Sequence, residues 1–428
     1  MVILVTAILS IVSFLLGKLI FRYFLNPITL YVVVWGIQIF LYELKLIRYA
    51  DLSLEAWMVI GSAFFCFLMG VLFYYTWHSQ NPRRISGSQE RLLAFLENRP
   101  AMIHWLIFGL ALIGILGPLQ HWKVLLQRFG SIPNVFLNAY KIYQMRMHGE
   151  IRGFIPYISS FLFASVFFSG MYTGHHGKLP LGGFLAFVGV VLEDLANMGR
   201  VQMLFALLEF GITTWVYRIG GLGKSIKIKK INVVFIFLFT FIFFTVFATV
   251  VKSIRGGVER YKSATMALKK VNKDMPISPS IYLYFSSQIV VLSKYLEKES
   301  ETCIWGENTF LPIYNLIAKT GWIERPRFYQ KGYYVPMWTN TGTYLREIHA
   351  DFGYPGIFVV PFLLGFFSTW AWFAFMNSKK AIHFVFLVYF MVIIGFSFLM
   401  MITRLGIWWI SLFFILVFVI LLNRIPIK

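Results

Sequence analysis

Residues suited to binding a sugar gather between Trp338 and Gly356. This segment reads Trp-Thr-Asn-Thr-Gly-Thr-Tyr-Leu-Arg-Glu-Ile-His-Ala-Asp-Phe-Gly-Tyr-Pro-Gly. Threonine, asparagine and carboxylate side chains can hydrogen-bond sugar hydroxyls, and aromatic side chains can stack on sugar rings. The candidate sugar-binding residues are Trp338, Asn340, Thr341, Thr343 and Tyr344. The segment therefore predicts a carbohydrate site.

The same region contains candidates for a general base. His349 and Asp351 are the first choices, and Glu307 is in reserve. Thr341 or Thr343 can cap a helix whose first turns carry both His349 and Asp351. Two alternatives stay open. Substrate positioning can supply much of the rate without any base. The final Phe-Gly-Tyr-Pro-Gly run can simply shape the start of a membrane helix.

Four arginines are candidates for binding a phosphate or pyrophosphate group: Arg200, Arg255, Arg260 and Arg404. The guanidinium group is a rigid fork of donors that can hold a phosphate through two hydrogen bonds. Several such groups near one leaflet would form a receptor for a lipid pyrophosphate. They would also stabilise the charge that develops on a pyrophosphate leaving group.

Other roles for the basic residues are also open. Arg200 follows Glu193 and Asp194 in one polar hairpin, so pairing with either acid would be purely structural. Arg404 lies between two apolar stretches and has no acid near it in sequence. The many lysines can extend to ordinary lipid headgroups.

Most known catalytic motifs are absent from the chain. It has no HExxH, CxxC, GxxxxGK[ST] or GxSxG pattern and no glycine-rich dinucleotide fingerprint. Its four aspartates are isolated from one another, so no DxD-type metal–nucleotide site is expected. We predict no metal and no cofactor. A transferase for soluble sugar nucleotides and a metal-dependent phosphatase are both disfavoured.

The elements that must position these residues are membrane helices. The 428-residue chain is 58% hydrophobic and only 13% charged, against about 25% charged in soluble domains. A soluble fold of this size could not bury that much apolar surface. The net charge of +21 then fits an anionic lipid surface or an anionic lipid-linked substrate, and no nucleic-acid partner is expected.

Hydropathy predicts about eleven transmembrane helices, since each needs roughly 20 apolar residues. The expected spans lie near 2–22, 28–44, 56–76, 101–119, 155–173, 181–196, 200–217, 231–251, 354–375, 382–401 and 405–423. Short basic loops favour the cytoplasm. Placing the basic loops at 83–99, 218–230 and 379–380 there puts the N-terminus outside and the C-terminus inside.

This topology leaves two long segments outside, 120–154 and 252–353. A loop of about a hundred residues is far longer than usual, which indicates function or disorder. Its aromatic clusters and the helical periodicity around 281–296 argue against disorder, so we expect short helices packed on the outer membrane face. We treat 1–428 as a single integral membrane domain.

Taken together, the sequence resembles the oligosaccharide repeat-unit polymerases, the O-antigen polymerase (Wzy-type) family. The spans carry this resemblance over nearly the whole chain. The matching motifs are Gly199-Arg200, Gly306-Glu307-Asn308-Thr309-Phe310, Asn340-Thr341-Gly342-Thr343-Tyr344-Leu345, Asp351-Phe352-Gly353 and Gly356. Pro355, just before Gly356, departs from the pattern.

The resemblance implies a metal-independent glycosyltransferase of the membrane GT-C type, acting at the periplasmic face of the bacterial inner membrane. It would transfer the growing glycan from undecaprenyl pyrophosphate onto a new undecaprenyl-pyrophosphate-linked repeat unit. Donor, acceptor and membrane lipids are then the expected partners, together with a possible chain-length regulator. The alternatives are an O-antigen ligase that uses lipid A-core as acceptor and, from a different class, a transporter or flippase for the lipid-linked unit.

Overall fold

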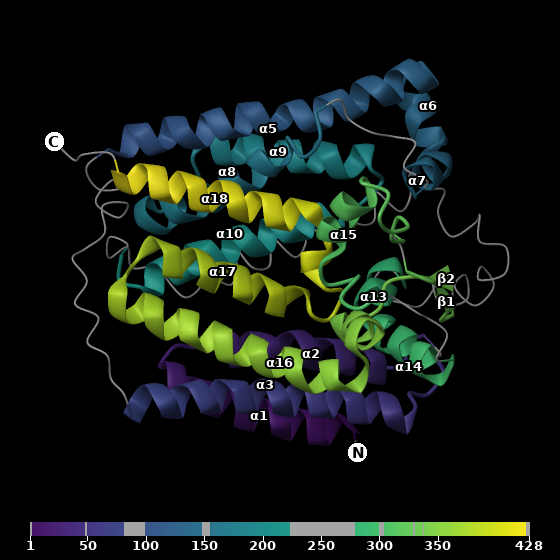
Figure 1. Ribbon diagram of the computed structural model, residues 1–428, viewed down its shortest axis with the longest axis vertical. Coiled ribbons are helices and arrows are strands. Elements are labelled where there is room, and N and C mark those ends of the chain that lie inside the picture. The colour runs from purple at the N-terminus through teal and green to yellow at the C-terminus, as the bar shows by residue number, and fades with distance from the viewer. Residues whose placement is uncertain are drawn as a thin grey trace. The chain divides into compact units, whose positions relative to one another are not determined.

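The computed structural model describes residues 2–47, 49–80, 99–147, 155–222, 279–298, 304–327, 330–336 and 338–424. Within these ranges the protein is helical almost throughout, and its one sheet consists of two strands of two residues each (Figure 1). The predicted span 231–251 lies outside the described residues, as do Arg255 and Arg260.

The described chain forms two compact units. Unit 1 comprises residues 1–85, 266–377 and 389–406, and unit 2 comprises 86–265, 378–388 and 407–428. Each unit therefore joins segments from distant parts of the chain. The units are described separately below.

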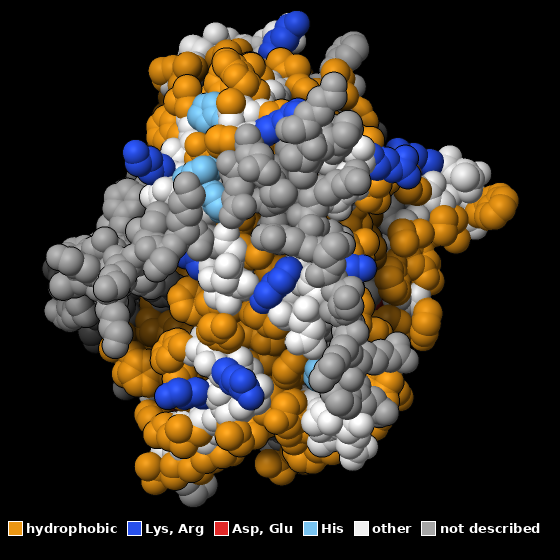
Figure 2. All heavy atoms as spheres, turned by 90° about the vertical axis from the view of Figure 1, so that its left-hand side faces the viewer, with side chains coloured by type: hydrophobic (Ala, Val, Ile, Leu, Met, Phe, Trp, Pro, Cys, Tyr) orange, Lys and Arg blue, Asp and Glu red, His pale blue; other side chains and the backbone are white. Residues whose placement is uncertain are grey.

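The long helices identify an all-α membrane protein. Five described helices are long and apolar enough to cross a bilayer: α1 (Val2–Phe21), α3 (Leu54–Gln80), α5 (Pro100–Phe129), α16 (Tyr344–Ser378) and α18 (Gly406–Arg424). Two shorter apolar helices are α2 (Pro27–Glu43) and α17 (Ala381–Phe396). Apolar side chains cover much of the face in Figure 2, and the charged side chains visible on its described atoms are all basic.

Of the eleven predicted spans, ten lie in the described part of the chain, and a helix occupies each of these ten. The three not yet named are α8 (Ser160–His176), α9 (Leu181–Ala196) and α10 (Val201–Ile219). These three helices are shorter or less apolar than the five long helices. The total of eleven spans therefore stays a prediction.

Unit 1 is organised around a close parallel pair, α3 and α16. Their N-terminal ends meet where the Tyr354 hydroxyl donates to the Glu55 carboxylate, and their C-terminal ends meet at His78 and Asn377. Between these ends the backbones touch through two glycines, Gly70 and Gly365. Small residues of this kind allow membrane helices to approach closely.

Helix α16 is broken at Gly353. This glycine has φ 63° and ψ −157°, a conformation that is essentially restricted to glycine. The break separates a short helix, 344–352, from the apolar helix that follows. It matches the predicted start of a membrane span at residue 354, and it gives the Phe-Gly-Tyr-Pro-Gly run the structural role that the sequence left open.

The described part of the long loop 252–353 contains the short helices that the sequence predicts. They are α13 (Pro279–Ser286), α14 (Gln288–Lys298) and α15 (Leu311–Ala318). Strands β1 (Tyr333–Tyr334) and β2 (Trp338–Thr339) follow, with Tyr333 opposite Thr339 and Tyr334 opposite Trp338. Strand β1 lies against α14 (Figure 1). This layer belongs to unit 1, in which Tyr49 contacts Ser286 and Tyr282 of α13.

Unit 2 is a bundle of α5, α8, α9 and α10. Glycines again sit at the crossings: Gly170 and Gly174 of α8 face Thr213 and Tyr217 of α10. Helix α5 continues to Phe129, well into the predicted outer segment 120–154, and α6 (Ile132–Leu137) and α7 (Ala139–Met147) follow it. This segment is therefore helical over most of its described length.

Candidate functional site

The carboxylate of Asp351 holds the loop that contains Asn308 and Thr309. The Asn308 backbone N–H and Nδ2 both donate to Asp351 Oδ1 at 2.8 Å. The Thr309 backbone N–H and Oγ1 both donate to Oδ2 at 2.7 Å. Because both oxygens accept two hydrogen bonds, Asp351 fixes this loop at the last turn before the Gly353 break. The geometry favours a positioning role over that of a general base.

One helical turn before Asp351, Glu347 forms a buried ion pair with Arg404. Arg404 Nη1 lies 2.8 Å from Glu347 Oε1, and the two side chains are 5% and 3% exposed. Glu347 also accepts hydrogen bonds from Gln330 Nε2 at 3.0 Å and from the Met401 backbone N–H. Arg404 Nη2 donates to the Arg327 carbonyl at 3.2 Å. Arg404 has no acid near it in the sequence, and the fold places Glu347, 57 residues away in the chain, beside it.

These two arrangements are joined into one network. Thr403 Oγ1 donates to the Thr309 carbonyl at 3.0 Å, so the segment after α17 is tied to the loop that Asp351 holds. We call this set the α16 polar cluster; it consists of Asn308, Thr309, Gln330, Glu347, Asp351, Thr403 and Arg404. All of its members belong to unit 1.

The α16 polar cluster also satisfies an irregular stretch of backbone. Helix α17 ends at Phe396, and α18 does not begin until Gly406; only the short 3₁₀ helix η2 (Ile402–Arg404) lies between them. Non-helical backbone near membrane depth is tolerated where protein or a water-filled cavity surrounds it. Glu347 accepts from the Met401 N–H, and the Ser397 carbonyl accepts from the Tyr344 N–H at 3.0 Å.

Two candidate bases remain less constrained than Asp351. His349 is half-buried, and its Nδ1 lies 3.0 Å from the Tyr295 hydroxyl. The Tyr354 ring packs edge-on against it at 4.7 Å. Glu307 is also half-buried, and one of its oxygens accepts from the Ile304 backbone N–H at 3.0 Å. Each side chain is oriented by a hydrogen bond and remains partly accessible.

The candidate sugar-binding residues divide into an accessible group and a core group. Trp338 in β2 is 62% exposed, and Asn340 and Thr341 are half-buried. Thr343 and Tyr344 are fully buried, and the Tyr344 hydroxyl lies 2.9 Å from that of Tyr31 on α2. Thr343 and Tyr344 therefore support the start of α16, whereas Trp338, Asn340 and Thr341 can meet a ligand.

Arg346 is a buried cation that the sequence analysis did not single out. Its guanidinium group lies 5.5 Å from the Tyr295 ring centroid and 5.1 Å from that of Tyr333. It also donates to the carbonyls of Lys331 at 2.6 Å and Asn340 at 3.2 Å. Arg346 thus fastens the β1–β2 hairpin to α16. The signal for it in the sequence is its position between the motif residues Leu345 and Asp351.

Arg200 lies in unit 2, where it is the residue immediately before α10 and is half-buried. Glu193, a possible partner from the sequence, instead lies 2.9 Å from His121 Nδ1 and accepts from Asn197 Nδ2 at 3.0 Å. Asp194 accepts from the Met203 backbone N–H at 2.8 Å and so caps the first turn of α10. His121, on α5, is a residue whose contact with this hairpin the sequence did not predict.

The Asp351 contacts predict a large effect on stability. Asp351→Ala should lower the midpoint of thermal unfolding in detergent, since it leaves four donors without their acceptor and each unsatisfied buried group costs about 1–3 kcal/mol. Asp51→Ala is the matched control, because Asp51 is exposed and makes only a 3.6 Å surface ion pair with Lys45. Equal midpoints for the two variants would contradict the positioning role.

No protein-family model, no curated protein and no solved structure matches this chain.

Proposed function

We propose that the protein is a membrane glycosyltransferase of the repeat-unit polymerase type. The α16 polar cluster is the observation that supports this function. It binds the loop around Asn308 to the segment Asn340–Gly356, so residues far apart in sequence converge at a break in a membrane helix. Trp305, in the loop around Asn308, and Trp338, just before Asn340, are 71% and 62% accessible and offer ring faces for sugars.

The proposed reaction joins two lipid-linked glycans. A hydroxyl at the non-reducing end of the acceptor forms a new bond to the anomeric carbon of the donor. The bond from that carbon to the pyrophosphate oxygen breaks, and undecaprenyl pyrophosphate leaves with the electron pair. The hydroxyl proton passes to a base or to solvent. His349 and Glu307 suit the role of base better than Asp351, whose oxygens are engaged.

The arginines take different parts in this scheme. Arg200 is only half-buried and immediately precedes α10, whose first turn is capped by Asp194. Its guanidinium group is therefore the part that supports contact with a phosphate. We assign it to the pyrophosphate, together with Arg255 and Arg260. Arg404 is neutralised by Glu347, so its first role is to hold the α16 polar cluster together.

The proposed enzyme has about eleven spans and GT-C architecture, and it works at the periplasmic face of the bacterial inner membrane. In unit 1, the C-terminal ends of α3 and α16 meet, and these ends lead toward the basic segments 83–99 and 379–380. The positive-inside rule places this end in the cytoplasm, and therefore places the Gly353 end outside.

The decisive experiment supplies purified protein with a lipid-linked repeat unit extracted from the source cells. The expected product is a ladder of lengthened glycans on a gel. Arg200→Ala should abolish the ladder while the chain inserts normally, whereas Arg424→Ala, at the exposed end of α18, should leave it intact. An unaltered ladder from Arg200→Ala would remove the pyrophosphate role of this residue.

The same assay separates the alternatives. A ligase would transfer glycan only when lipid A-core is added, and a flippase would move labelled lipid-linked units across vesicles without lengthening them. Absence of a ladder from the wild-type protein, with either of these activities present, would replace the polymerase proposal.

A further inference from the structure

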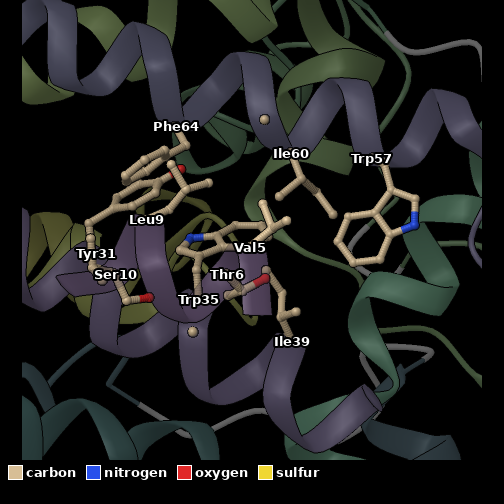
Figure 3. Close-up of a pocket in the computed structure, with 13 residues that line it drawn as sticks. Val5, Thr6, Leu9, Ser10, Tyr31, Trp35, Ile39, Trp57, Ile60 and Phe64 are labelled. Carbon is tan, nitrogen blue, oxygen red and sulfur yellow. The ribbon is translucent and has the colours of Figure 1, made fainter. Parts of the chain in front are cut away.

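Helices α1, α2 and α3 enclose a groove in unit 1 with a volume of about 310 Å³ (Figure 3). Its lining is almost entirely apolar, and its ends are marked by Trp57 on one side and by Phe64 and Tyr31 on the other. Residues Val5, Thr6, Leu9 and Ser10 of α1 also line it. Cavities of this size are at the lower end of those that bind small molecules.

Two glycines create the space, and two buried aromatic residues form the floor. Gly36 and Gly61 lie in the lining, and a Cβ atom added at Gly61 would meet nothing within 4 Å. Tyr31 and Trp35 in the floor are 2% and 5% exposed. A groove with a fixed, buried floor differs from the shallow furrows between helices that ordinary lipids fill.

The polar atoms of the floor are directed to partners elsewhere in unit 1. The Tyr31 hydroxyl pairs with that of Tyr344 at 2.9 Å, and Trp35 Nε1 donates to Ser397 Oγ at 2.9 Å. With these atoms engaged, the groove offers little to water. Tyr344 is also the first residue of α16, one turn before Glu347. The floor of the groove is therefore linked through Tyr344 to the helical turn of α16 that carries Glu347.

The groove continues the surface through which unit 1 meets the membrane. Val5 and Leu9, each 50% exposed, belong to the apolar face of α1, on which Ile8 and Val12 are also exposed. Helix α1 is one of the helices long and apolar enough to cross a bilayer. The groove is thus reached from the hydrocarbon of the bilayer, and its occupant must itself be apolar.

We propose that this groove binds the isoprenoid tail of the lipid-linked substrate. This inference rests on the proposed function, and it assigns the tail-binding part of the site to α1, α2 and α3. The location supports the substrate over a bulk lipid, because Tyr31 in the groove contacts Tyr344, which precedes Glu347 of the α16 polar cluster by one helical turn. Burying the tail would hold the lipid carrier near the polar groups that act on its head.

The test measures lipid binding without turnover. The full-length protein in detergent is incubated with undecaprenyl phosphate, and retained lipid is measured by native mass spectrometry in the presence of competing phosphatidylethanolamine. Gly61→Phe introduces a ring in the groove lining, at a position where the added Cβ meets nothing within 4 Å. Gly109→Phe on α5 is the matched control, since its Cβ also meets nothing within 4 Å and it lies outside the groove. Val5→Trp narrows the groove from α1 and serves if Gly61→Phe folds poorly.

The expected result is about tenfold weaker retention of undecaprenyl phosphate by Gly61→Phe or Val5→Trp, with wild-type retention by Gly109→Phe. Equal retention by all variants overturns the proposal. So does displacement of the isoprenoid lipid by phosphatidylethanolamine at equal concentration, which identifies an ordinary lipid site. A wild-type protein that retains undecaprenyl phosphate through this groove but forms no ladder would refute the polymerase function and leave the binding result standing.

Discussion

Arg404→Ala is expected to lower the free energy of unfolding by about 3–5 kcal/mol, the usual cost of removing one partner of a buried ion pair. The substitution leaves the Glu347 carboxylate buried and without its closest cation. It also removes the hydrogen bond to the Arg327 carbonyl. The irregular segment between α17 and α18 should loosen as a result. The measurement is the midpoint of thermal unfolding of purified protein in detergent.

A double variant, Glu347→Leu with Arg404→Met, is the matched control. Replacing both members of a buried ion pair by apolar residues is often neutral or stabilising, but Glu347→Leu also leaves Gln330 and the Met401 N–H without an acceptor. This variant should therefore recover part of the stability that Arg404→Ala loses. If it also forms the glycan ladder, Arg404 serves only the structure. If it is stable but inactive, the charge acts in the reaction. An Arg404→Ala protein as stable as wild type would contradict the ion-pair argument.

Gly365→Ala should lower the stability of the protein nearly as much as Arg404→Ala does. The cause here is disturbed helix packing rather than a broken ion pair. A Cβ atom at Gly365 would lie 2.1 Å from the Phe67 carbonyl oxygen, and one at Gly70 would lie 2.0 Å from that of Phe362. Neither backbone can yield without separating α3 from α16. Overpacking of a core costs about 1–3 kcal/mol and more where no side chain can move. We expect a lower unfolding midpoint for Gly365→Ala and for Gly70→Ala.

Gly61→Ala provides the comparison on the same helix. Its added methyl group meets nothing within 4 Å, and alanine is a better helix former than glycine by about 1 kcal/mol. Its unfolding midpoint should therefore equal or exceed that of the wild type. Equal losses of stability in Gly61→Ala and Gly70→Ala would contradict the argument that the close contact between α3 and α16 causes the loss at Gly70.

The helices and their ends could be predicted from the sequence because they depend on local pattern. The span beginning at 354 is preceded by Gly353 in a conformation suited to glycine, and the periodicity at 281–296 matches α13 and α14. The accessible position of Trp338 fits its predicted role in sugar binding. These features depend on residues that are close together in the sequence, so the sequence alone can predict them.

The pairing of distant side chains could not be predicted. Arg404 has no acid near it in sequence, so its alanine variant would have been expected to insert and fold normally; the contact with Glu347 changes that expectation. Tyr344 is a residue type that often binds ligands, but here its side chain is buried in the core and its hydroxyl contacts that of Tyr31. Glu193 has Arg200 near it in the sequence, but in the fold it contacts His121, which lies 72 residues earlier in the chain.

Unit 1 is built from segments that are far apart in the chain, and this affects how it can be synthesised. Trp35 and Gln38 find hydrogen-bond acceptors at Ser397 and Phe398, 362 and 360 residues later in the chain. At about 5–20 residues per second, a ribosome needs roughly 20 to 70 seconds to make that length. Gln38 also donates to Gln288, which is made earlier, but Trp35 Nε1 lacks its Ser397 acceptor for all of this time. A chain truncated before Ser397 should therefore be a target for membrane quality-control proteases.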